Sequence, residues 1–117
     1  MSEGMPQAIK LNKFGIIIAD YFGHIPYHVG SSLSTKAWRD VDVRLILPDA
    51  EYAQTFGEPP NYMNPKIAAI TLAFCALGKE MTGLPIDFQI QSQTEANRYK
   101  GPRSALLEVE SDLEVSR

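Results

Sequence analysis

Residues 40–47 read DVDVRLIL, and charged and aliphatic residues alternate through most of this segment. Every odd-numbered position in the segment is aliphatic, while Asp40, Asp42 and Arg44 are charged. Side chains two residues apart on a β-strand leave the same face of the sheet. The segment therefore predicts a strand with one buried face and one largely polar face.

Similar patterns predict further elements on both sides of this strand. Apolar residues at helical spacing predict helices over 8–22 and 65–82, and Asn64 is a suitable N-cap for the second helix. Short strands are predicted over 27–30 and 86–91. This order of elements indicates an α+β fold: a small mixed sheet of three to four strands with helices packed on one face.

Composition limits the domain organisation and the possible partners. The chain has 117 residues and a net charge of −3, which predicts one domain over 1–117 and disfavours a polycationic nucleic-acid binder. The single cysteine excludes an internal disulfide, and no apolar run is long enough to span a bilayer. We expect a cytoplasmic protein without a membrane partner, with 1–6 frayed and 104–117 as an uncertain tail.

Three acidic residues are candidates for a metal site. Asp40 and Asp42 share one face of the predicted strand, and Asp87 lies on the polar side of a later strand. If the two strands are neighbours, the three carboxylates can converge, as chemistry with two Mg²⁺ ions on phosphates requires. The alternative is that the acids only solvate the outer face of the sheet.

A small turn precedes these acids. Gly30 and Ser31 stand at the end of the short strand predicted over 27–30. Glycine permits a close approach of a ligand to the backbone, and the serine hydroxyl and backbone N–H groups can hold a triphosphate. A Gly-Ser pair is also an ordinary turn, so this signal gains weight only together with the acids.

Together these motifs resemble the nucleotidyltransferase superfamily related to DNA polymerase beta. The matching pieces are HVGS at 28–31, DVDV at 40–43 and IDF at 86–88, and the resemblance covers about 8–91. It implies a minimal nucleotidyltransferase domain in which Gly30 and Ser31 contact the β- and γ-phosphates. It also implies that Asp40, Asp42 and Asp87 are the catalytic residues and ligate two Mg²⁺ ions, with Asp87 helping to activate the attacking hydroxyl.

Basic and aromatic residues near these motifs are candidates for binding the nucleotide. The basic candidates are Lys36, Arg44, Arg98, Lys100 and Arg103. The aromatic candidates Tyr52, Phe56 and Tyr62 stand in a segment that reads as a loop or short irregular helix, where they could form a lid over the substrate.

Three functions remain open at this point. The first is Mg²⁺-dependent transfer of a nucleoside monophosphate from an NTP to a hydroxyl on a protein, an RNA or a small molecule. The second is a non-catalytic or regulatory module of the same fold that acts through a protein partner, as in toxin–antitoxin pairs, or as a homo-oligomer. The third is a metal-dependent nuclease, which Gln89 disfavours because a lysine is expected at that position.

Overall fold

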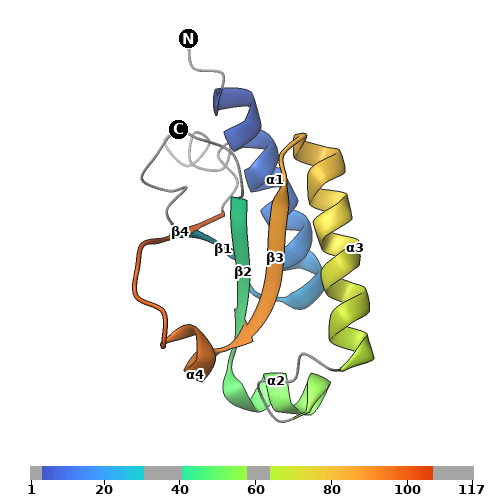
Figure 1. The fold of residues 1–117 in the computed structure, drawn as a ribbon, viewed down its shortest axis with the longest axis vertical. Coiled ribbons are helices and arrows are strands. Elements are labelled where there is room, and N and C mark those ends of the chain that lie inside the picture. The colour runs from blue at the N-terminus through green and yellow to red at the C-terminus, as the bar shows by residue number, and fades with distance from the viewer. Residues whose placement is uncertain (1–3, 31–40, 58–63, 107–117) are drawn as a thin grey trace, which may run out of the picture.

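A computed structural model describes residues 4–30, 41–57 and 64–106, with side chains from residue 8 onward. Helices and strands are interspersed along the described chain (Figure 1). In chain order they are α1 (Gly4–Phe22), β1 (Tyr27–Val29), β2 (Val41–Leu47), α2 (Asp49–Phe56), α3 (Pro65–Thr82), β3 (Ile86–Ser92), α4 (Gln93–Ala96) and β4 (Arg103–Ala105).

The four strands form one mixed sheet in the order β3-β2-β1-β4. Strand β1 is antiparallel to β2 and to β4, whereas β2 and β3 are parallel. The parallel pair is connected through α3, which supplies the long crossover that parallel strands need. The predicted α+β class with a small mixed sheet is thus confirmed.

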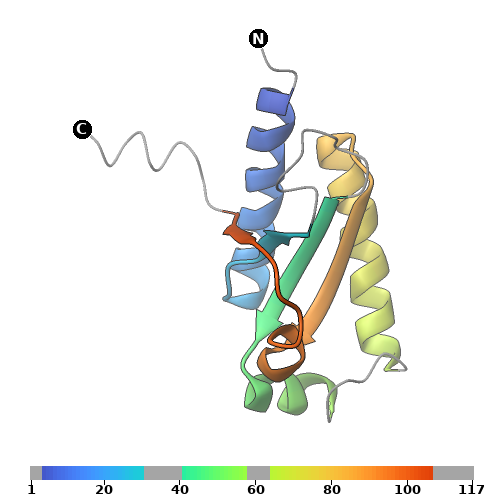
Figure 2. The ribbon, with the colours of Figure 1, turned by 60° about the vertical axis from the view of Figure 1, so that its left-hand side comes forward.

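Helices α1 and α3 cover one face of the sheet (Figure 2). The alternation in β2 buries Val41, Val43, Leu45 and Leu47, which are at most 2% exposed, on this face. The opposite face carries the alternate side chains of β2 and β3, among them Asp42, Arg44 and Asp87. The segment from α4 to β4 crosses this face (Figure 2). The buried core includes Leu11, Phe14, Ile18, Val41, Val43, Leu45, Ile67, Phe88 and Ile90.

Helix α3 begins and ends where its local sequence predicts. The Asn64 side chain accepts hydrogen bonds from the backbone N–H groups of Lys66 and Ile67, and Pro65 occupies the first helical turn. Gly83 ends the helix in the left-handed conformation, with φ +75°. These end points fix where β3 starts, beside β2.

Several elements differ from the sequence-based expectations. Helix α1 begins at Gly4, inside the stretch expected to be frayed. Of the two alternatives for the following segment, a loop or a short irregular helix, residues 49–56 adopt the helix, α2. Strand β4 includes Ser104 and Ala105, which were assigned to the tail, whereas 107–117 lie outside the described residues. Over the described ranges, no helix has the length and apolar character needed to cross a membrane.

Candidate functional site

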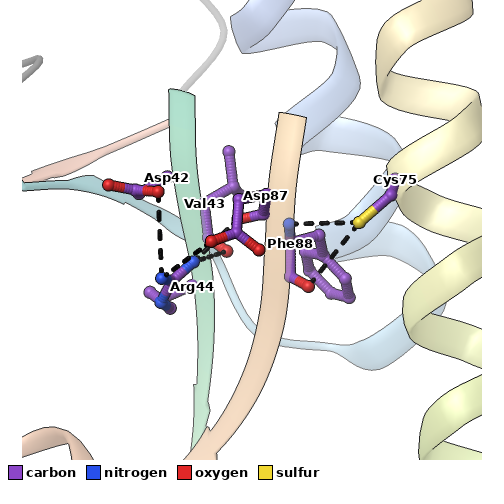
Figure 3. Close-up of polar contacts among 6 residues, drawn as sticks. All are labelled: Asp42, Val43, Arg44, Cys75, Asp87 and Phe88. Atoms are coloured by element: carbon purple, nitrogen blue, oxygen red, sulfur yellow. Dashed lines mark hydrogen bonds and ion pairs between the residues drawn. The ribbon is translucent and has the colours of Figure 1, made fainter. Parts of the chain in front are cut away.

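Asp42 and Asp87 occupy paired positions on the parallel strands β2 and β3 (Figure 3). One guanidinium nitrogen of Arg44 lies 3.9 Å from Asp42 Oδ1 and 3.4 Å from Asp87 Oδ2. Because both carboxylate oxygens lie within 3.9 Å of the same nitrogen, the distance between them is less than twice that value. The other terminal nitrogen of Arg44 donates to the backbone carbonyl oxygens of Asp87, at 2.7 Å, and Val43, at 3.2 Å. Arg44 thus neutralises part of the charge of both acids.

Gly30 lies directly against Asp42 at the end of β1. It has φ +90°, and a Cβ atom at this position would lie 2.7 Å from Asp42 Oδ2. Because glycine has no side chain, the backbone can turn here and approach the carboxylate closely. The Gly30 backbone is thereby brought against Asp42 of the acidic pair.

A cavity of about 370 Å³ extends along the polar face of the sheet from this corner. Its walls come from β1, β2, β3 and the α4–β4 segment. Three cationic side chains and one carboxylate line it, so its local charge favours an anionic ligand. The lining residues are Val29, Gly30, Asp42, Arg44, Ile46, Gln89, Gln91, Ala96, Tyr99, Lys100, Gly101, Pro102 and Arg103.

Two contacts hold the α4–β4 segment over the cavity. Asp49, at the start of α2, accepts hydrogen bonds from the backbone N–H and the hydroxyl of Thr94. These bonds lower the pKa of the Asp49 carboxyl. Farther along, Arg103 donates to the carbonyl oxygen of Ala96 at 2.8 Å. The segment is therefore tied to the rest of the fold at its α4 end and across its own turn.

Two buried ionisable groups lie next to the site. His28 in β1 is 5% exposed, and burial lowers the pKa of its imidazole. Glu95 in α4 is 6% exposed, and its Oε1 accepts no hydrogen bond from the described residues. Burial raises the pKa of this carboxyl, against the opposing effects of Arg98 and Arg44.

The structure brings together some of the residues predicted for the site. Gly30, Asp42, Arg44, Lys100 and Arg103 line the cavity. Asp87 stands beside it with half of its side chain exposed, and Arg98 is exposed but not part of the lining. The predictions for Ser31, Lys36 and Asp40 concern residues outside the described ranges. Within those ranges, no three His, Cys, Asp or Glu side chains are grouped so that they could hold a metal ion.

The suggestion of an aromatic lid is wrong for two of its three residues. Tyr52 and Phe56 are 0% and 2% exposed and pack edge to face in the core, because α2 turns both rings inward. Tyr62 lies outside the described residues.

The lining also includes residues that were not among the sequence-based candidates, among them Ile46, Gln89, Gln91 and Tyr99. The period-two pattern of β3 already placed the two glutamines on the same face as Asp87, so this signal was present in the sequence.

In the comparisons with known proteins, no family model matches the chain, and neither a curated protein nor a solved structure matches it significantly.

Proposed function

We propose that this chain is a Mg²⁺-dependent nucleotidyltransferase that transfers a nucleoside monophosphate from an NTP to a hydroxyl group. One observation carries the proposal: Asp42 and Asp87 stand side by side on parallel strands, with the Gly30 backbone against Asp42. Two adjacent carboxylates next to an open backbone turn and an electropositive cavity suit a metal–triphosphate ligand.

The donor atoms of the site fit Mg²⁺, which prefers carboxylate oxygens and usually retains water and phosphate ligands. Asp42 and Asp87 would hold the ion together with Asp40, the third acid of the resemblance. When bound, Mg²⁺ would neutralise negative charge on the nucleotide phosphates.

The side chains of the cavity have separate roles in this proposal. Lys100, Arg103 and Arg44 bind phosphate oxygens, and Gly30 leaves room for the phosphates at the end of β1. The acceptor hydroxyl oxygen attacks the α-phosphorus and forms the new P–O bond. The bond from the α-phosphorus to the bridging oxygen breaks, and pyrophosphate leaves with that electron pair. Asp87, half exposed beside the cavity, takes the hydroxyl proton.

The second candidate is a non-catalytic module of the same fold that acts through a protein partner. Arg44 favours it, because its guanidinium already supplies positive charge to both carboxylates. A site that never holds a metal ion would need such a permanent counter-charge.

Calorimetric titration with the four NTPs, with and without Mg²⁺, tests the proposal. We expect Mg²⁺-dependent binding that Asp42→Asn weakens by at least about tenfold, because the affinity of the site for Mg²⁺ would depend on carboxylate charge. The matched control is Asp20→Asn, the same change on an exposed position of α1. A folded wild-type protein that binds no NTP at millimolar Mg²⁺ would contradict the enzyme and favour the module.

A further inference from the structure

The outward face of α3 is apolar along most of the helix. No residue from 67 to 78 is charged, and the exposed members of this stretch form the outward face: Ala68, Ala69, Leu72, Ala73 and Ala76. Leu72 is 71% exposed, more than any other large apolar side chain of the described residues. A helix on the surface of a monomer usually turns charged side chains toward water. The outward face of α3 therefore has the character of an interface.

An apolar groove adjoins this face, between α3 and β3. It has a volume of about 500 Å³ and is lined by Ile67, Ala68, Thr71, Leu72, Gln89 and Ile90. In the described sheet, β3 is an edge strand. Its edge is occupied at Phe88, where the backbone N–H donates to Cys75 Sγ at 3.3 Å and the carbonyl oxygen accepts from the thiol at 3.8 Å (Figure 3). The surface is thus better suited to a second helix than to an added strand.

The charges on α3 indicate which helix this is. Lys66 and Glu80 are both exposed and lie at opposite ends of the apolar stretch. They are fourteen residues apart, which is about four turns or roughly 21 Å, so both lie on the same side of the helix. Ala73 is midway between them. A second copy of α3 that runs antiparallel about Ala73 therefore places its Glu80 opposite Lys66, and its Lys66 opposite Glu80.

We propose that this chain forms a two-fold symmetric homodimer through the outward face of α3, with the two helices antiparallel. A two-fold contact buries the same patch on both copies, so one apolar face is sufficient. Leu72 is next to the axis at Ala73 and meets its counterpart there. A parallel pair of helices would instead bring like charges together at both ends. Because α3 covers the face of the sheet opposite the cavity (Figure 2), the cavity stays open and the proposal does not depend on the proposed function.

Sedimentation velocity of the full chain tests the proposal. We expect the wild-type protein to have a mass of twice 13.0 kDa at concentrations up to roughly 0.1 mM. Leu72→Asp should be monomeric at the same concentrations, because the dimer would bury an unpaired charge. Tyr99→Asp, at a side chain that is 63% exposed on the opposite face of the sheet, is the matched control and should stay dimeric. A wild-type monomer throughout this range would overturn the proposal and leave the outward face to a different protein.

Charge reversal tests the antiparallel arrangement. Lys66→Glu and Glu80→Lys each place like charges opposite one another, and each should raise the dissociation constant of the dimer at least about tenfold. When the two single variants are mixed, they should form a heterodimer with nearly wild-type affinity, because both pairs again have opposite charges. The double variant Lys66→Glu/Glu80→Lys should recover for the same reason. These exposed positions keep the proposal testable if Leu72→Asp does not fold, and equal dissociation constants for the wild-type protein and all the charge variants would contradict it.

Discussion

Asp42 and Asp87 are register partners on parallel strands, and a single nitrogen of Arg44 lies within 3.9 Å of a carboxylate oxygen of each. Like charges directly opposite on neighbouring strands destabilise a sheet. Arg44 offsets this repulsion and is itself 14% exposed, so it is well shielded from solvent. The chain itself thus supplies a counter-charge to both carboxylates.

The first prediction concerns the removal of this counter-charge. Arg44→Met keeps the aliphatic length but leaves the two carboxylates facing each other, and should lower the free energy of unfolding by about 1–2 kcal/mol. Millimolar Mg²⁺ should stabilise this variant more than the wild-type protein, because a ligand that binds only the folded state raises its stability. Urea unfolding with and without Mg²⁺, at constant ionic strength, measures both effects.

The double variant Arg44→Met/Asp42→Asn is the control for this experiment. It removes one of the two opposed charges, so it should recover stability and lose most of the response to Mg²⁺. If Arg44→Met is destabilised but Mg²⁺ has no added effect, the two acids do not form a cation site.

The second prediction uses two glycines with similar backbone conformations. Gly30 has φ +90° and Gly23 has φ +79°, but only a Cβ at Gly30 would meet Asp42, whereas the space around Gly23 is open to 4 Å. Each change to alanine costs about 1 kcal/mol or more through the positive φ. Gly30→Ala should cost more than Gly23→Ala, because Asp42 must also move, and it alone should impair NTP binding. Urea unfolding and NTP titration of both variants give the comparison. Equal losses of stability in the two variants would show that the close contact between Gly30 and Asp42 does not matter for stability.

Local sequence signals account for the elements that surround the site. Asn64 and Gly83 mark both ends of α3 through hydrogen bonds and a left-handed turn made within a few residues of each. The alternation of side chains within β2 was enough to predict which face of this strand is buried. The pairing of Asp42 with Asp87 could be expected only on the condition that β2 and β3 were neighbours.

The parts that the sequence did not reveal depend on distant contacts. Strand β4 has three residues, too few for a periodic pattern, and it exists because it pairs with β1. Helix α2 could be expected only as an alternative to a loop, because a glycine and two prolines follow closely, although Tyr52 and Phe56 fill the core. The hydrogen bond from Arg44 to the Asp87 carbonyl oxygen spans 43 residues and follows only from the parallel register.

The third prediction concerns acid sensitivity. Burial lowers the pKa of His28. As the pH falls, the imidazole of this residue is therefore protonated in the unfolded chain before it is protonated in the folded protein. The stability that depends on neutral His28 is present above the unfolded pKa of about 6.5 and is lost as the pH falls from there through the folded pKa. His28→Gln cannot take up this proton and should flatten the dependence in that window. The chain has two histidines, and His24→Gln is the control because it leaves His28 in place. The measurement is the urea midpoint of each variant between pH 4 and 8. If only His24→Gln flattened the dependence of the midpoint on pH, His28 would not be the group responsible.

The fourth prediction concerns Glu95, whose pKa burial raises. Below the unfolded pKa of about 4.5, the carboxyl is protonated in both the folded and the unfolded state, so no charge is buried. As the pH rises from there through the folded pKa, the unfolded chain releases its proton first, and the folded state loses stability relative to it. Glu95→Gln removes the buried charge, so it should be more stable than the wild-type protein at pH 7 and nearly equal to it below pH 4.5. Asp20→Asn, an exposed position on α1, is the control in the same urea titrations. If Glu95→Gln is instead less stable at pH 7, attraction between the Glu95 carboxylate and Arg98 or Arg44 outweighs the cost of its burial.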